Sequence, residues 1–106
     1  MPEMHFTVEW PSGKSSRCYS PSYVIEEYFA VGDEYSVDEF LSRARTCLHT
    51  ASERVRARYG FACSSALDEL AQIEATAASL DAFQREGRVK ITAFEKHPPR
   101  DARASR

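Results

Sequence analysis

The chain has 106 residues, of which 42% are hydrophobic, 11% aromatic and 28% charged, and its formal net charge is −2. This length is enough for one hydrophobic core, and the composition is that of an ordinary globular protein rather than a disordered or collagen-like one. We therefore expect a single α+β domain over residues 1–97, without a membrane span, because no apolar run approaches the roughly 20 residues that a transmembrane helix needs.

The first predicted elements form a β-hairpin followed by a short helix. Apolar and polar residues alternate over residues 4–10, a period of two that indicates a strand with one buried face. Residues 11–14 have the composition of a tight turn, so residues 15–19 can return as the partner strand. Ser20 is then expected to cap a helix over residues 21–29, with proline at its first position.

A long helix and a second helix are predicted next, as an antiparallel hairpin. Ser36 and Glu39 fit a capping box at the start of the long helix, and Gly60 is its expected end. Ser64 or Ser65 can cap the second helix, which the short link makes an antiparallel neighbour of the first. The apolar stripe of the long helix has spacings of three and four residues: Val37, Phe40, Leu41, Ala44, Leu48, Ala51, Val55 and Tyr59.

The last predicted element is a strand over residues 88–96, where apolar and polar residues alternate again. We expect it to join the first hairpin in a small three-stranded sheet, which gives the order β-β-α-α-α-β and the α+β class. Prolines end this strand, and residues 98–106 are expected to be a disordered tail.

The basic residues are concentrated in the middle of the chain. Residues 43–63 contain five arginines and a single acid, Glu53, whereas residues 1–42 are acidic. On a helix the basic side chains form two rows, which border the apolar stripe: Arg43, Arg54 and Arg58 on one side, and Arg45, His49 and Arg56 on the other. Two interpretations remain open. Either the arginine stems cover the core edge while their charged heads are solvated or paired with the acidic N-terminal third of the chain, or one row binds the anionic groups of a partner.

Neither a metal site nor a cofactor is expected. Cys47 and His49 are two residues apart on a helix and diverge by about 200°, and the other histidines and cysteines are scattered along the sequence. Glycine-rich phosphate loops and known catalytic motifs are missing from the sequence. Cys63 is the best candidate for a nucleophile, because it precedes a predicted helix whose amides can lower a thiol pKa. The sequence is equally consistent with Cys63 as a buried apolar residue.

Three segments carry a resemblance to a known family: residues 1–6, residues 18–22 and, above all, residues 51–64, with the run RYGFACS at 58–64 the most specific. They resemble the small nitrogen-starvation-response proteins encoded in bacterial nitrilase gene clusters. The resemblance implies an association with enzymes for nitrogen scavenging from nitriles or cyanide. It implies no catalytic residue.

We therefore predict a non-catalytic accessory protein that binds a protein partner, namely an enzyme of the nitrilase cluster. The candidate binding residues are Arg54, Arg58, Tyr59 and Cys63. The alternative is a small enzyme or ligand-binding protein for a nitrogenous metabolite, which uses Cys63 with Arg54 and Arg58. We expect no nucleic-acid partner, because such proteins are usually basic overall.

Two further expectations concern location and assembly. The first residues have neither the basic start nor the apolar region of a signal peptide, and the three cysteines form no CxxC pair, so we expect a cytoplasmic protein with reduced thiols. A helical hairpin on a small sheet leaves one sheet face open, which would allow a homodimer.

Overall fold

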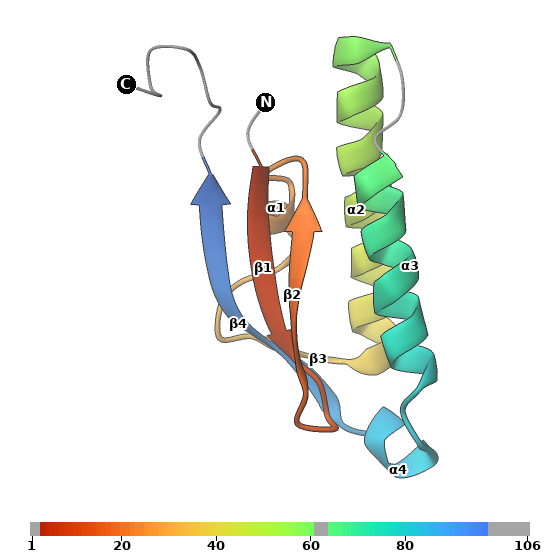
Figure 1. Cartoon of the computed structure of the whole chain (residues 1–106). Coiled ribbons are helices and arrows are strands. Elements are labelled where there is room, and N and C mark those ends of the chain that lie inside the picture. The colour runs from red at the N-terminus through yellow and green to blue at the C-terminus, as the bar shows by residue number, and fades with distance from the viewer. Residues whose placement is uncertain (1–2, 61–63, 98–106) are drawn as a thin grey trace.

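A computed structural model describes residues 3–60 and 64–97, and it confirms the α+β class (Figure 1). Four strands and four helices are described in these ranges. In chain order they are β1 (Glu3–Glu9), β2 (Ser15–Ser20), α1 (Ile25–Tyr28), β3 (Glu34–Ser36), α2 (Val37–Tyr59), α3 (Ser64–Ala78), α4 (Ala82–Arg85) and β4 (Arg88–His97).

The sheet is antiparallel and has four strands in the order β2-β1-β4-β3. β1 and β4, which come from the two ends of the described chain, are neighbours at its centre. The prediction of three strands was wrong, because Glu34–Ser36 pairs with the start of β4. A strand of three residues is too short to give an alternating pattern, and sequence reasoning had assigned Ser36 only to a helix cap.

The core lies on one face of this sheet. The four apolar residues of the first predicted strand, Met4, Phe6, Val8 and Trp10, are each no more than 1% exposed. They pack against the buried stripe of α2, where for example Trp10 meets Phe40 edge to face at 5.4 Å between ring centroids. The period-two pattern therefore predicted the buried face of β1 correctly.

Helix α2 begins and ends where the sequence predicted. The Ser36 side chain accepts a hydrogen bond from the Glu39 N–H, and Gly60 caps the other end with a left-handed φ of 85°. One half of the expected capping box differs: the Glu39 carboxylate accepts from Arg43 at 2.7 Å rather than reaching back to Ser36. Seven of the eight predicted stripe residues are buried, and Tyr59 in the last turn is 48% exposed.

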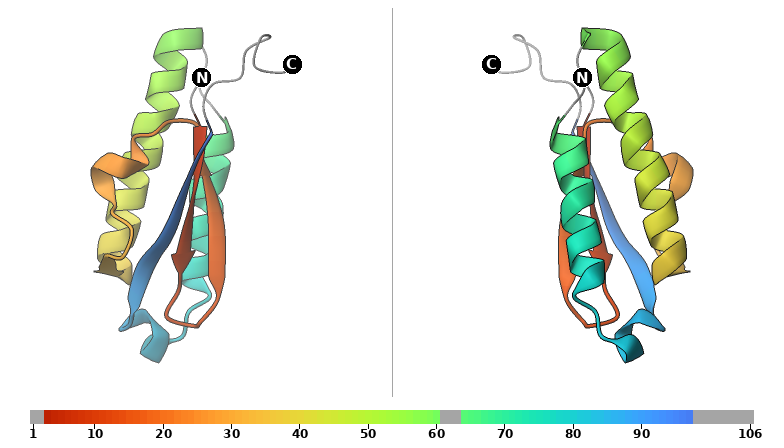
Figure 2. Two further views of the ribbon diagram at one scale, coloured as in Figure 1. Left: turned by 90° about the vertical axis from the view of Figure 1, so that its left-hand side faces the viewer. Right: turned by 90° about the vertical axis from the view of Figure 1, so that its right-hand side faces the viewer.

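Helices α2 and α3 run antiparallel and cover one face of the sheet, as predicted for the helical hairpin (Figure 2). Helix α3 lies beside the edge strand β2, where the Glu69 carboxylate accepts a hydrogen bond from the Tyr19 backbone N–H at 2.9 Å. None of the described elements covers the opposite sheet face (Figure 2). Of the helices described, none combines the length and apolar content that crossing a bilayer requires.

The segment before α1 corrects a predicted helix over residues 21–29. Helix α1 spans only Ile25–Tyr28, and its N-cap is Val24 rather than Ser20. The Ser20 hydroxyl instead donates to the Ser22 carbonyl at 2.8 Å, and the Ser22 hydroxyl accepts from the Val24 N–H. These local bonds stabilise a turn that competes with the helix. The predicted disordered tail, residues 98–106, lies outside the described residues.

Candidate functional site

The first arginine of the predicted Arg43 row serves the fold. Arg43 donates to the Glu39 carboxylate at 2.7 Å and to the Tyr28 carbonyl at 2.8 Å. Its guanidinium also lies 4.9 Å from the centroid of the Tyr35 ring. Because α1, β3 and α2 each supply one of these contacts, Arg43 connects three elements and is poorly placed to bind a separate partner.

Arg54 follows Arg43 in the same row, eleven residues and about three helical turns later. Its side chain contacts other elements of the protein and is also partly exposed to solvent. Its guanidinium donates to the buried Ser22 hydroxyl at 3.3 Å and lies 3.4 Å from the Glu27 carboxylate. The Arg54 side chain remains 48% exposed and that of Glu27 62%. An exposed ion pair of this kind contributes little stability, so Arg54 can exchange Glu27 for a carboxylate of another molecule.

The second row is also paired along most of its length. Arg45 donates to Glu74 of α3 at 2.7 Å, which connects the two long helices. Arg56 lies 3.7 Å from Glu53 in a pair that is more than half exposed on both sides. The guanidinium groups of Arg43 and Arg45 are therefore both paired, but only Arg43 pairs with the acidic N-terminal third, because the partner of Arg45 is Glu74 of α3.

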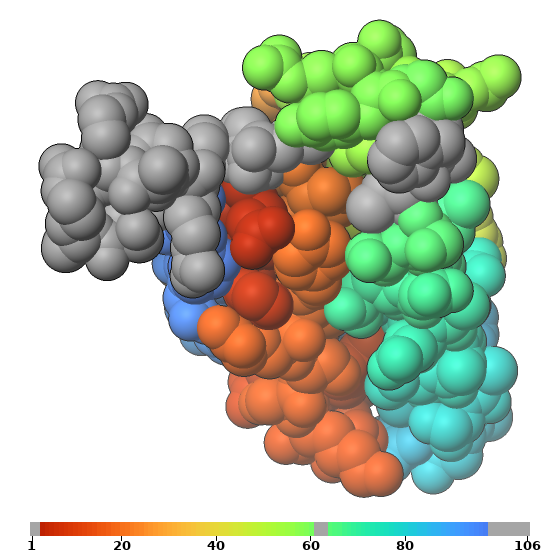
Figure 3. Space-filling view, turned by 45° about the horizontal axis from the view of Figure 1, so that its top comes forward, coloured from red at the N-terminus to blue at the C-terminus, as the bar shows by residue number. Residues whose placement is uncertain are grey.

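The last turn of α2 differs from the rest of the helix because it has no buried residue. Val55 is the last buried residue of α2, and Arg56, Arg58 and Tyr59 beyond it are exposed. The Arg58 guanidinium lies 6.0 Å from the centroid of the Tyr59 ring. Figure 3 shows this end of α2, in green, at the top of the view and above the red and orange N-terminal strands. Cations also suit the C-terminal end of a helix, because the unpaired carbonyls there carry partial negative charge.

We name these four residues, Arg54, Arg56, Arg58 and Tyr59, the α2 terminal surface. It contains three of the four binding residues that the sequence analysis singled out. The fourth, Cys63, lies outside the described residues, so the structure does not place its thiol relative to the arginines. The alternative in which Cys63 is a nucleophile stays a prediction.

The two other cysteines are buried and reduced. Cys18 in β2 and Cys47 in α2 are each 0% exposed. Burial, together with the nearby Glu69 carboxylate, raises the Cys18 pKa far above its usual range. Burial and Glu27 raise the pKa of Cys47 to about 12. Both thiols are therefore protonated at neutral pH and are not nucleophiles.

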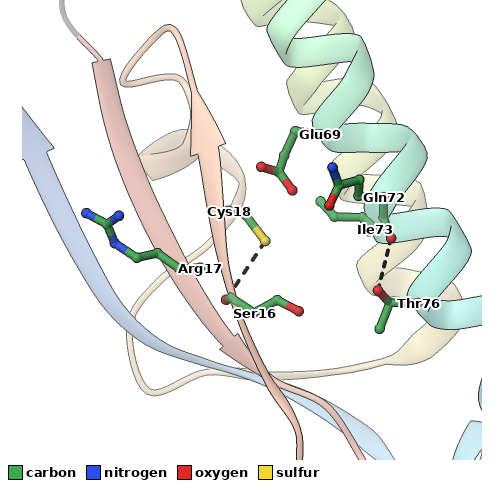
Figure 4. A pocket seen from close by; sticks show the side chains of 7 residues that line it. All are labelled: Ser16, Arg17, Cys18, Glu69, Gln72, Ile73 and Thr76. Carbon is green, nitrogen blue, oxygen red and sulfur yellow. Dashed lines mark hydrogen bonds between the residues drawn. The ribbon is translucent and has the colours of Figure 1, made fainter.

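A second feature, which sequence reasoning missed, is a pocket of about 240 Å³ between β2 and α3 (Figure 4). Its lining is mostly polar: Ser16, Arg17, Cys18, Glu69, Gln72, Ile73 and Thr76. Several of these groups already have partners, since Glu69 accepts from the Tyr19 N–H and Arg17 donates to Glu95 on the open face. No sequence signal could have shown the pocket, because it depends on how a strand and a helix about 50 residues apart pack together.

Comparison with known proteins gives one finding. The family model described as nitrogen starvation-induced protein NitG matches residues 5–94. Neither a curated protein nor a solved structure shows a significant match. The match spans most of β1 and of β4 and every described element between them, and it includes the arginine-rich segment of α2. The chain therefore belongs to the NitG family of nitrogen starvation-induced proteins.

Proposed function

We propose that this protein is a non-catalytic accessory protein of the nitrogen-starvation response, and that it binds an acidic surface of a partner protein through the α2 terminal surface. The partner we propose is an enzyme encoded in a nitrilase gene cluster, which it meets in the cytoplasm. Membership of the NitG family supports the physiological setting, namely starvation for nitrogen. The partner itself is inferred from the resemblance and from the charge of the surface.

The observation that carries the proposal is the exposure of Arg56, Arg58 and Tyr59 beyond the last buried residue of α2, next to Arg54, whose side chain is 48% exposed. Side chains past Val55 are exposed and belong neither to the core nor to its edge. Arginine and tyrosine are also the residue types that dominate protein interfaces, because each combines a large contact area with directed hydrogen bonds.

Charge supports an acidic partner. The α2 terminal surface carries three guanidinium groups, and the acids that pair with Arg54 and Arg56, Glu27 and Glu53, are 62% and 67% exposed. Arginine binds carboxylates with two parallel hydrogen bonds, so a partner with clustered acids would be recognised by geometry as well as by charge. Such an interface forms faster at low salt, because complementary charges steer the encounter.

The test is an affinity capture from nitrogen-starved host cells with in-cell cross-linking, followed by identification of the cross-linked peptides. Native protein is compared with an Arg54→Glu/Arg58→Glu variant and with a Lys14→Glu/Arg88→Glu control. The control makes the same change of charge at exposed positions in the β1–β2 turn and at the start of β4, at the opposite end of the molecule (Figure 1). Circular dichroism establishes that both variants are folded.

We expect native protein and the control to capture the same cluster enzyme, cross-linked close to the end of α2, and the Arg54→Glu/Arg58→Glu variant to lose it. The proposal is wrong if no cluster enzyme is captured by native protein, or if both variants capture it equally well.

A further inference from the structure

The uncovered face of the sheet brings together side chains from the two ends of the described chain. On this face, antiparallel pairing of β1 and β4 places Glu3 opposite His97 and His5 opposite Glu95. Two imidazoles and two carboxylates therefore occupy adjacent cross-strand positions. Directly opposite residues of an antiparallel pair have Cβ atoms only about 5 Å apart, so all four side chains share one small area.

The side chains of the two histidines place a nitrogen of one ring close to a nitrogen of the other. His5 Nδ1 and His97 Nε2 are 3.0 Å apart, and the rings meet edge to face. In a tetrahedral zinc site with Zn–N bonds of 2.0–2.1 Å, two ligand nitrogens are about 3.3 Å apart. One of the two nitrogens now carries the hydrogen of their shared bond. Moving that hydrogen to the other nitrogen of its own ring leaves two lone pairs that face each other across 3.0 Å, and rotation of both rings directs them at one metal ion beside the line between the nitrogens.

The surroundings hold this arrangement in place. The Tyr19 ring packs edge to face against His5 at 5.6 Å between centroids, and its hydroxyl donates to the Glu3 carboxylate at 3.1 Å. Arg17 donates two hydrogen bonds of 3.0 Å to Glu95. The Glu3 and Glu95 carboxylates therefore lie beside the histidines, but each already accepts hydrogen bonds from another side chain. Within residues 3–60 and 64–97 no group of three or more metal-ligating side chains could hold a metal ion, so the site proposed below has two protein ligands.

We propose that His5 and His97 bind a divalent transition-metal ion, such as Zn²⁺, on the open face of the sheet. His5 binds through Nδ1 and His97 through Nε2, and water completes the coordination. Nitrogen ligands select late first-row metals over Mg²⁺ and Ca²⁺, which prefer oxygen. This site lies on a different face from the α2 terminal surface and does not depend on the proposed partner.

The test is isothermal titration of tag-free, full-length protein with Zn²⁺ and, separately, with Mg²⁺. His5→Gln and His97→Gln each remove one ligand and keep a polar side chain of similar size. The matched control is His49→Gln, because His49 is exposed on α2 and is the third histidine of the chain. All variants carry Cys63→Ser, so that this thiol contributes no metal affinity. Nitrogen-15 spectra of the imidazole rings show which nitrogen of each ring binds the metal.

We expect one Zn²⁺ per chain, with an affinity weakened at least about tenfold in His5→Gln and in His97→Gln, since loss of even an outer-shell partner costs 10–100-fold. His49→Gln should bind Zn²⁺ like the parent, Mg²⁺ should not bind, and Zn²⁺ should shift His5 Nδ1 and His97 Nε2. The proposal is overturned if the parent does not bind Zn²⁺, or if the His5 and His97 variants bind it as tightly as the His49 variant does.

Discussion

The contact between Glu69 and the edge of the sheet gives a sharp test of the packing of α3. β2 is the last strand on its side of the sheet, so its outer edge has no neighbouring strand among the described residues. One backbone group of that edge, the Tyr19 N–H, donates to the Glu69 carboxylate at 2.9 Å. The Glu69 carboxylate therefore accepts the hydrogen bond that a backbone carbonyl of a further strand would otherwise accept from Tyr19.

Replacing Glu69 by alanine removes this acceptor and leaves the Tyr19 N–H to water from the adjoining pocket. A hydrogen bond to a charged group contributes about 1.5–3 kcal/mol. Because water can reach the freed N–H, we expect a loss near the lower end, about 1–2 kcal/mol in the free energy of unfolding. Glu69→Gln keeps a neutral acceptor and should lose roughly half as much, since charge-assisted hydrogen bonds are about twice as strong as neutral ones.

The assay is urea denaturation followed by circular dichroism, with extrapolation to zero denaturant. The matched control is Asp68→Ala, which makes the same change of net charge at an exposed position of α3. Analytical ultracentrifugation adds a second readout, because an uncapped edge strand promotes association between chains. If Glu69→Ala were no less stable than Asp68→Ala, the reasoning that Glu69 anchors α3 to β2 would be refuted.

Three more predictions concern the core, the thiols and the pH dependence. Leu48→Ala, at a position that is 0% exposed, should lower the free energy of unfolding by about 2–5 kcal/mol in urea denaturation; a loss below 1 kcal/mol would contradict its place in the core. Cys18 and Cys47 should resist alkylation at pH 8 until the protein is unfolded, because burial raises both pKa values, and mass spectrometry of the alkylated peptides checks this. The pKa of His5 is lowered by burial and by Arg17, so the unfolded chain binds this proton more tightly and stability should fall as the pH drops through 6.5. His5→Gln should flatten that dependence in denaturation curves measured between pH 5 and about pH 8, and an unchanged slope would argue against the shift.

Long periodic elements of this fold could be predicted from the sequence, because their patterns contain many residues. The alternation from Met4 to Trp10 predicted a buried strand face, and all four of its apolar residues are buried. The stripe of α2 and its end at Gly60 were likewise predicted. Each of these depends on a local rule, either side-chain period or cap chemistry, that does not require knowledge of the rest of the chain.

The short elements β3 and α4 were not predicted, because three or four residues are too few to show a periodic pattern of apolar residues. β3 has three residues and exists only because β4 offers a free edge at Arg88–Lys90. Helix α4, Ala82–Arg85, is a single turn whose capping box, Asp81 with Gln84, was not recognised. In the segment before α1, the sequence matched a capping rule, but the Ser20 and Ser22 hydroxyls stabilise a turn instead.

Features that depend on tertiary packing were beyond the sequence. The row of arginines was visible, yet the partners of Arg43 and Arg45 come from other elements. His5 and His97 are 92 residues apart and looked unrelated, and only the pairing of β1 with β4 brings their rings together. Among the histidines and cysteines, sequence spacing revealed only neighbours on one helix, such as Cys47 and His49.

The central claim, that the α2 terminal surface binds a partner enzyme, is tested most directly by measuring affinity between purified proteins. Biolayer interferometry would compare native protein, Arg54→Glu/Arg58→Glu and Lys14→Glu/Arg88→Glu against each purified enzyme of the nitrilase cluster that we propose as the source of the partner. We predict saturable binding of one enzyme that is unchanged in the control. Binding should weaken at least about tenfold in the Arg54→Glu/Arg58→Glu variant, because truncation of an arginine that is a hot spot of an interface costs about 2 kcal/mol or more. Equal affinity of the two variants, or no binding of any cluster enzyme by native protein, would contradict the account.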